Sequence, residues 1–370
     1  MARTLTRHND PTDPAGSTGS AGAAGASAPR GRGLRVCLYN GSGKMAERSG
    51  IGSAMRHQRA MLRDAGSRAV EFWERPDIVQ LNTVFPDSVI AGAVAKARGI
   101  PVVVFAHSTR QDFEGSWIGS RALAPLFEKW LRIVYRGGDV VVTPTPYSRS
   151  IIENYGIDAP IRVLTNGVDT EFFAGGPEAR ARFRTAHGIS DDQRVVLSVG
   201  HLMTRKGIVE YVDLASSMPE VEFYWAGTVA SAAMTPDVRA ALDRAPANLH
   251  LLGHIPPAEV RDAYAGADLF CFMSHEETQG IVVLEALASG VPVLVRDIPV
   301  YADWLPEGVV TYKAATTSEF AHLAQAILDG VAPDLTEAGR SLAAEHDLTR
   351  VAEGLASVHD EVLERLGLTA

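Results

Sequence analysis

The chain has 370 residues, of which 46% are hydrophobic, with a formal net charge of −9 and a mean hydropathy of +0.01. This length suggests two domains, each large enough to bury its own hydrophobic core. The acidic balance argues against a nucleic acid as the main partner, but a local basic patch could still contact a membrane surface. No apolar run has the length of a membrane span, and the longest, around residues 281–295, is interrupted by Glu285 and Gly290.

The first 33 residues are predicted to form a disordered tail. Residues 10–33 consist mainly of Gly, Ala, Ser, Thr and Pro, a composition that offers no material for a hydrophobic core. The arginines near the start are not followed by the apolar segment that a signal peptide requires. We therefore expect the protein to stay on the cytoplasmic side, with its two cysteines, Cys37 and Cys271, as buried free thiols.

Residues 34–172 alternate between continuous apolar runs and amphipathic segments. Such apolar runs are typical of strands that are buried on both faces of a parallel sheet, and the segments between them have helical spacing. The predicted strands are 34–39, 69–73, 77–82, 101–106, 139–144 and 161–165, and the predicted helices are about 53–65, 87–98, 123–135 and 148–155. This rhythm indicates a doubly wound, Rossmann-like N-terminal domain.

The alternation lapses in residues 173–193, which are rich in Gly, Pro and Arg and are predicted to be the interdomain linker. It resumes in a second Rossmann-like domain, residues 194–345, and residues 346–370 are predicted to form a C-terminal helix that returns to the N-terminal domain. The predicted strands are 194–200, 221–227, 249–253, 268–273 and 293–295, and the predicted helices are 236–244, 257–265 and 281–288, with another after residue 207. The fold class is therefore α/β, with two doubly wound domains facing a ligand-binding cleft.

The segment 272–299 carries the strongest functional signal. A buried strand runs into a polar turn, residues 276–280, and a short apolar helix and a second strand follow. This order places a helix N-terminus at the carboxyl end of a parallel sheet, where phosphates bind. Glu277 precedes that N-terminus and Glu285 lies inside the helix, so that a carboxylate can accept hydrogen bonds from sugar hydroxyls. The segment therefore predicts a site for a nucleotide-sugar.

Two adjacent cations follow the first strand of the second domain. Arg205 and Lys206 lie in the sequence GHLMTRKG, and a guanidinium and an ammonium beside a helix start suit a diphosphate. The alternative is a solvated basic turn. The chain contains no Asp-x-Asp metal clamp, and His275-Glu276-x-x-Gln279 lacks the second histidine of a zinc motif. We therefore expect no metal, with the cations and the helix N-terminus neutralising the leaving group.

Two features of the N-terminal domain are candidates for the other side of the cleft. His107 ends a predicted strand, where it is either a structural histidine or a group that faces the cleft. The Gly-rich loop after the first strand contains Gly41, Gly43, Gly50 and Gly52. It could be a dinucleotide-binding loop or a flexible connection, and our preferred interpretation is that its N–H groups line the cleft.

The segment 117–136 contains an amphipathic helix that could pack on its own sheet or contact a membrane. Phe127, Trp130, Leu131 and Val134 recur on one face, and basic residues gather on another. The membrane hypothesis requires tryptophans and cations to face outward together. Periodicity alone leaves both interpretations open.

Several of these motifs, taken together and in order, resemble the retaining glycosyltransferases of family 4, which have the GT-B fold. The similarity is greater still to the bacterial 1,2-diacylglycerol 3-glucosyltransferases. It extends from about residue 34 to residue 313, and the matching segments are SGIGSAMRHQRAML, LNTVFPDS, AHSTRQDFEGSWIGS, TPTPYS, LTNGVD, RKGI, EETQGIVVLEALASG and RDIPVYADWL.

The resemblance implies roles for the matching positions. His107 and Glu277 are the expected catalytic residues, at the reacting face and at the sugar hydroxyls respectively. The expected donor-binding residues are Gly50, Gly52, Arg205, Lys206, Gln279, Gly280, Ile281, Val282 and Glu285, with Arg205 and Lys206 on the diphosphate and Glu285 on the ribose. Departures from the family pattern, such as His201 in place of a common arginine and Arg110-Gln111 after the His107 motif, lie partly on the acceptor side.

The function implied is transfer of a hexose, expected to be glucose from UDP-glucose, to diacylglycerol with retention of configuration. The family requires no metal for catalysis and works on the membrane surface, here expected to be the cytoplasmic face. One alternative is a family 4 enzyme that acts on a soluble small-molecule acceptor. A remote alternative is a dinucleotide-dependent oxidoreductase that uses the loop at Gly41, and a glycoside hydrolase with Glu277 and Glu285 as its carboxylate pair is disfavoured.

Overall fold

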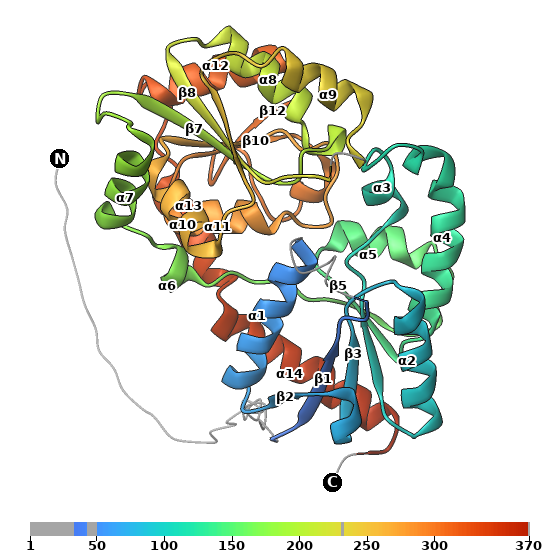
Figure 1. Ribbon diagram of the computed structural model, residues 1–370. Coiled ribbons are helices and arrows are strands. Elements are labelled where there is room, and N and C mark those ends of the chain that lie inside the picture. Colours follow the sequence, from blue (N-terminus) through green and yellow to red (C-terminus); the bar gives the residue numbers. More distant parts are fainter. Residues whose placement is uncertain (1–32, 43–49, 231–232, 369–370) are drawn as a thin grey trace, which may run out of the picture. The chain divides into compact units, whose positions relative to one another are not determined.

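The computed structural model describes residues 33–42, 50–230 and 233–368 (Figure 1). Except for Gly33, the predicted tail lies outside the described residues, as does Gly43. The described chain forms two parallel sheets, each of six strands. The α/β prediction is thus confirmed, because continuous apolar runs became strands and the amphipathic segments between them became helices.

The first sheet has the strand order β2-β1-β3-β4-β5-β6. Its strands are β1 (Arg35–Tyr39), β2 (Arg68–Val70), β3 (Ile78–Leu81), β4 (Val102–Phe105), β5 (Val140–Thr143) and β6 (Ile161–Val163), and its connecting helices are α1 (Gly50–Asp64), α2 (Pro86–Ala97), α3 (Arg110–Phe113), α4 (Ser120–Arg136) and α5 (Pro146–Glu153). Every residue of β3, β4 and β5 is buried, as expected for strands covered on both faces.

The strand predicted over residues 69–73 was wrong in its second half. After β2 ends at Val70, residues Phe72–Glu74 form the short 3₁₀ helix η2. The carboxylate of Glu74 accepts a hydrogen bond from the N–H of Glu71 at 2.7 Å. This local cap satisfies the backbone and stops the strand, which the apolar pattern alone did not reveal.

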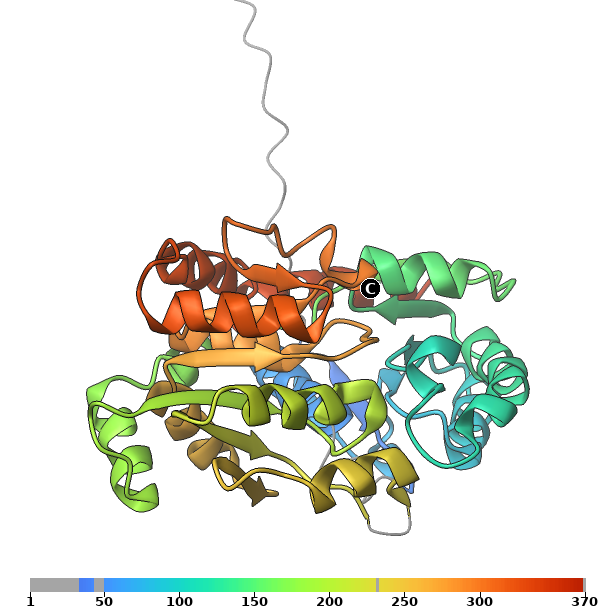
Figure 2. The ribbon, with the colours of Figure 1, turned by 90° about the horizontal axis from the view of Figure 1, so that it is seen from above.

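The second sheet has the strand order β12-β11-β10-β7-β8-β9. Its strands are β7 (Arg194–Val199), β8 (Val221–Ala226), β9 (Leu249–Gly253), β10 (Leu269–Phe272), β11 (Val293–Arg296) and β12 (Tyr312–Ala314), and its helices are α8 (Ile208–Ser217), α9 (Pro236–Asp243), α10 (Pro257–Gly266), α11 (Ile281–Ser289), α12 (Thr317–Leu328) and α13 (Thr336–Glu345). Helices α8, α9 and α12 cover one face, and α10, α11 and α13 cover the other (Figure 1). Viewed from above, α8 and α12 lie in front of the strands (Figure 2).

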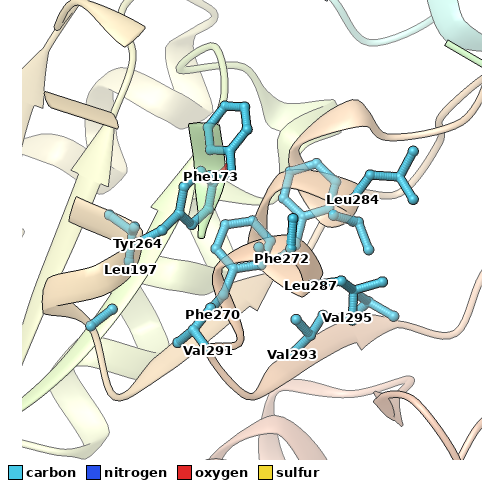
Figure 3. Packing of buried hydrophobic residues seen from close by; sticks show 14 of the residues in the cluster. Phe173, Leu197, Tyr264, Phe270, Phe272, Leu284, Leu287, Val291, Val293 and Val295 are labelled. Atoms are coloured by element: carbon cyan, nitrogen blue, oxygen red, sulfur yellow. The ribbon is translucent and has the colours of Figure 1, made fainter. Parts of the chain in front are cut away.

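An aromatic cluster anchors α11 to this sheet (Figure 3). Phe270 and Phe272 project from β10 on the face that α10 and α11 cover, where the ring of Tyr264 lies 5.4 Å from that of Phe270. Leu284 and Leu287 of α11 are buried in the same cluster. Helix α11, whose N-terminus forms part of the predicted phosphate site, is therefore held in place by packing along its length.

The predicted linker is partly a packed helix. Residues Pro177–His187 form α7, which packs against α10, and Phe183 is buried in the core of the second sheet. The Arg184 side chain is buried as well, with its guanidinium 2.7 Å from Asp268. Residues 173–193 thus contain no strand, and the helix within them covers part of the second sheet with its apolar side chains.

The chain passes between the two halves at residues 164–169 and again at residues 346–348. The N–H of Val168 donates to the carbonyl of His346 at 2.9 Å, and the N–H of Leu348 donates to the carbonyl of Val168 at 3.1 Å. The last helix, α14 (Leu348–Arg365), then packs against α1, and its apolar side chains complete the core of the first sheet. We infer that residues 346–368 belong structurally with the N-terminal domain.

A buried polar chain marks the contact of α14 with the first sheet. His359 Nε2 lies 2.9 Å from Gln80 Oε1, and Gln80 Nε2 donates to Gln58 Oε1 at 3.4 Å. Burial lowers the pKa of His359 to about 4.

Both cysteines are buried free thiols, as predicted. In the described part of the chain, no helix combines the length and the apolar character needed to cross a membrane.

Candidate active site

In the turn before α11, the backbone comes close to a neighbouring side chain. Gly280 has φ +87°, a conformation that favours glycine, and a Cβ atom there would lie 2.9 Å from the hydroxyl of Tyr301. The nine-residue helix α11 begins at the next residue. Since the first N–H groups of a helix have no partner within it, Gly280, Ile281 and Val282 present backbone donors at the carboxyl edge of the second sheet.

An ion pair lies directly before this N-terminus. The ammonium of Lys206 contacts the carboxylate of Glu277, which also accepts a hydrogen bond from the hydroxyl of Ser274 at 2.7 Å. The side chain of Lys206 is 14% exposed and that of Glu277 is 8% exposed. Burial alone would raise the pKa of Glu277, but the charges of Lys206 and Arg205 outweigh it and lower that pKa. Burial lowers the pKa of Lys206, against the opposing effect of Glu277. The structure thus brings together two residues that the sequence analysis assigned to the donor site.

Arg205 reaches across to the first half. One guanidinium nitrogen, Nη1, lies 2.8 Å from the carboxylate of Asp112 and 2.8 Å from the carbonyl of Glu276. Its Nε donates to the hydroxyl of Ser116 at 3.2 Å. The side chain is only 10% exposed. The second predicted cation is therefore tied to the segment around α3, a contact between distant parts of the chain that the sequence does not reveal.

Glu276 provides a second link to the first half. The hydroxyl of Tyr147, on α5, donates to both of its carboxylate oxygens, at 2.9 and 3.1 Å. Burial raises the pKa of Glu276 to about 7, although the hydrogen bond from Tyr147 opposes this. Next to it, the hydroxyl of Thr145 donates to the carbonyl of Thr278 at 2.8 Å. The N-terminal turn of α5 thus rests on the loop that carries Glu277.

Gln279 has a structural task. Its Oε1 accepts hydrogen bonds from the N–H and the Nδ2 of Asn166, at 3.0 and 2.8 Å, and its Nε2 donates to the hydroxyl of Thr165 at 2.5 Å. The side chain is buried, so that all of its polar atoms are used by the segment that passes between the halves. We therefore assign Gln279 to positioning this crossing rather than to a side-chain contact with the donor.

Glu285 is buried inside α11, away from the surface. The hydroxyl of Tyr264 donates to its Oε2 at 3.0 Å. Burial raises the pKa of Glu285 to about 7, while the hydrogen bond from Tyr264 and the charge of Arg56 oppose this shift. Arg56 belongs to α1, which contacts α11. Gly50 and Gly52 open α1, with Gly52 buried, so the structure brings this helix and Glu285 together, while the loop 43–49 lies outside the described residues.

His107 lies at the carboxyl end of β4. Its ring stacks on that of Phe105, with the centroids 6.0 Å apart, and its Nε2 lies 3.4 Å from Oδ1 of Asn82. Burial lowers the pKa of His107 to about 4, so that the imidazole is neutral at physiological pH. Sequence reasoning missed Asn82, although a polar residue directly after an apolar strand was a usable signal.

Helix α4 packs on its own sheet through the face that periodicity identified. Leu131 and Val134 are buried, and Trp130 Nε1 donates to the carbonyl of Val84 at 2.6 Å. A membrane contact through Trp130 is therefore wrong. Other residues of α4, together with Ile118 just before it, are exposed, and we call them the outer surface of α4: Ile118, Leu123, Leu126 and Ile133, with Arg121, Lys129 and Arg136.

The described residues contain no group of three or more His, Cys, Asp or Glu side chains placed to hold a metal ion. The charged groups at the carboxyl edge are instead the pairs formed by Lys206 and Arg205 with carboxylates. This arrangement offers two cations and a helix N-terminus to an anion, and a carboxylate to hydroxyl groups.

Two family models and several known proteins match the chain. Residues 24–172 match the family model Glycosyltransferase Family 4, and residues 179–334 match the model Glycosyl transferases group 1. The chain is 35% identical over 337 residues to the processive diacylglycerol alpha-glucosyltransferase of Acholeplasma laidlawii, covering 90% of this chain and 99% of that protein. It is 27% identical to the alpha-galactosylglucosyldiacylglycerol synthase of Streptococcus pneumoniae, covering 85% of this chain and 86% of that protein.

Solved structures show the same fold at lower identity. Anabaena HepE in complex with UDP-glucose superposes with a TM-score of 0.71 at 16% identity, covering 89% of this chain and all of that one. WaaG, a glycosyltransferase of lipopolysaccharide biosynthesis, gives a TM-score of 0.61 at 17% identity, covering 88% of this chain and 98% of that one. Taken with the two parallel sheets and the sequence relatives, these findings show that the chain belongs to family 4 of the glycosyltransferases and is a glycosyltransferase enzyme with the GT-B fold.

Proposed function

We propose that this enzyme transfers a hexose, glucose from UDP-glucose, to the free hydroxyl of diacylglycerol with retention of configuration. The observation that carries the proposal is the buried Lys206–Glu277 pair in front of the N-terminus of α11. The acceptor follows from the sequence relatives, whose names identify them as enzymes that glycosylate diacylglycerol lipids.

The donor diphosphate would lie between the cations and the helix N-terminus. Lys206 contributes a point charge, Arg205 a planar donor group, and residues 280–282 their backbone N–H groups. Arg205 would exchange Asp112 for phosphate oxygens, since one guanidinium nitrogen now contacts that carboxylate at 2.8 Å. Glu277, held ionised by the two cations, would accept hydrogen bonds from the sugar hydroxyls.

The reaction itself is a displacement at the anomeric carbon. The bond from C1 to the diphosphate oxygen breaks with its electron pair on that oxygen, and a bond forms from C1 to the acceptor oxygen. The acceptor proton passes to the departing diphosphate on the same face of the sugar, which retains the configuration. The cations and N–H groups stabilise the negative charge that develops on the leaving group in a largely buried site.

The outer surface of α4 supports a membrane acceptor. It combines three exposed large apolar side chains of the helix, and the exposed Ile118 just before it, with three exposed basic residues of the helix. This combination is typical of a helix that lies at the surface of a bilayer containing anionic lipids. The basic residues form a local patch in a chain whose net charge is −9. We place the enzyme on the cytoplasmic face of the cell membrane as a peripheral protein.

A transfer assay tests the proposal. The full chain is incubated with radiolabelled UDP-glucose, UDP-galactose or GDP-mannose and liposomes that contain diacylglycerol, and labelled lipid is extracted and its anomeric configuration determined by NMR. We expect an α-glucosyl lipid from UDP-glucose only, undiminished by EDTA. Glu277→Gln and Lys206→Met should abolish it, with Glu220→Gln, an exposed site, as the matched control. A labelled water-soluble product instead of a lipid would reject the acceptor, and loss of turnover with EDTA would reject metal-free catalysis.

A further inference from the structure

Asn82 occupies a central position at the carboxyl edge of the first sheet. It follows β3, which pairs with β1 on one side and β4 on the other, and its backbone N–H donates to the carbonyl of Tyr39 at 3.1 Å. Its side chain is almost completely buried, with 1% of the residue exposed. Asn82 is therefore fixed between the ends of two strands, one of which carries His107.

The two ends of this amide differ in their surroundings. Oδ1 faces Nε2 of His107 at 3.4 Å, whereas Nδ2 is buried and has no hydrogen-bond partner in the described part of the chain. A buried amide N–H without a partner is costly, and folding alone would favour an apolar residue here. We therefore expect that an asparagine at position 82 serves a purpose other than the stability of the fold. The distance of 3.4 Å is long, as is common for catalytic groups before substrate binding aligns them.

We propose that Asn82 is the positioning residue of His107: its amide oxygen accepts the Nε2–H, which leaves Nδ1 unprotonated to accept a hydrogen bond from a substrate hydroxyl. The inference deepens the proposed function, on which it rests for the role of His107. Neutral imidazole has one donor and one acceptor, so fixing the donor at Nε2 assigns the acceptor to Nδ1.

The neutral state of His107 supports this assignment. Burial lowers the pKa of His107 to about 4, and the acceptor beside its Nε2, Oδ1 of Asn82, is uncharged. A neutral amide beside the ring preserves that state, whereas a carboxylate would favour the imidazolium. An uncharged acceptor at Asn82 therefore keeps Nδ1 unprotonated, whereas a carboxylate there would favour protonation of Nδ1.

Two substitutions of Asn82 separate positioning from packing. Asn82→Asp keeps the shape and can only accept, so the Nε2–H tautomer is retained while the pKa of His107 rises. Asn82→Leu keeps the volume and removes the acceptor. Asn154→Asp, at an exposed helix end, is the matched control, because it adds the same charge away from the site. Thermal unfolding of each variant shows whether it is folded.

The ratio of variant to wild-type kcat/KM is measured against pH in the liposome assay. The ratio removes any pH dependence from Glu276 and Glu285, which both enzymes share. For Asn82→Asp we expect a ratio that is constant above about pH 8 and falls about tenfold per pH unit once the pH is below the raised pKa of His107. Asn82→Leu should lose about a hundredfold at every pH, mainly in kcat. A pH-independent ratio for Asn82→Asp, or full activity of Asn82→Leu, would overturn the proposal.

A spectroscopic measurement makes the test independent of turnover. Protein labelled with ¹⁵N-histidine is examined by two-bond ¹H–¹⁵N correlation near neutral pH, with His107→Gln to assign the signals. We expect His107 to be neutral and protonated at Nε2 in the wild type, and cationic over a wider pH range in Asn82→Asp. Protonation at Nδ1 in the wild type would refute the assignment even if the enzyme is active. An inactive wild type with the expected tautomer would instead reject the proposed function alone.

Discussion

Replacing Lys206 with methionine should destabilise the protein by about 3 kcal/mol near neutral pH, because it leaves the Glu277 carboxylate buried without its ammonium partner. For a domain of this size, that loss lowers the midpoint of thermal unfolding by roughly 6–12 °C. Removal of both charges in the Lys206→Met, Glu277→Gln double variant should recover stability to within about 1 kcal/mol of wild type.

The pH dependence of this defect provides an independent check. In the wild type the pKa of Glu277 is lowered, so its contribution to stability is present above its unfolded value and is lost as the pH falls through the folded pKa. Without Lys206, burial would raise the pKa of Glu277, and protonation would relieve the unpaired charge. The stability difference between Lys206→Met and wild type should therefore shrink as the pH is lowered from about 7.5 to 5.

Denaturant unfolding of the four proteins, wild type, both single variants and the double variant, measures the coupling energy. Lys96→Met is the control, because the Lys96–Asp139 pair has a lysine that is 40% exposed and should contribute less than about 1 kcal/mol. Single variants as stable as wild type, or additive losses in the double variant, would refute a buried ion pair at this position.

Three further predictions follow from other parts of the structure. His359 has a folded pKa of about 4, below its unfolded value, so stability falls as the pH drops from about 6.5 towards 4; His359→Gln should remove about 2 kcal/mol of that loss at about pH 5, measured by denaturant unfolding. Asp112→Asn frees Arg205 from its carboxylate partner and should tighten UDP binding several-fold by calorimetry, and weaker binding would mean that Asp112 orients Arg205 instead. Leu126→Glu, on the outer surface of α4, should reduce flotation with anionic liposomes at least about tenfold with unchanged thermal stability, and Val331→Glu, an exposed apolar site elsewhere, should not.

Local patterns were sufficient to predict most strands of the two sheets and the turn before α11, because the information lies in adjacent residues, but β12 was not predicted. The strands were visible as apolar runs, and Glu277 and Lys206 were each recognisable within short motifs. The contact of Arg205 with Asp112 was not predictable, since it joins positions that only the folded chain brings together. The environment of α4 was left open for a related reason. Periodicity finds two faces of a helix but does not say which of them covers the sheet.

Residues 276–279 link the geometry of the proposed donor site to the distance between the two halves of the chain. Along this turn, Glu276 contacts Tyr147, the carbonyl of Thr278 accepts from Thr145, and Gln279 holds the crossing at Asn166. The side chain of Glu277, in contrast, contacts Lys206 of the second half. Neighbouring residues of this short turn are bound to both halves of the chain. A change in the separation of the two halves must therefore move Glu277 relative to the N-terminus of α11. Substitutions of Gln279 should therefore alter catalysis without any contact to the substrate, and the geometry of the sugar site is set as much by the first half as by the second.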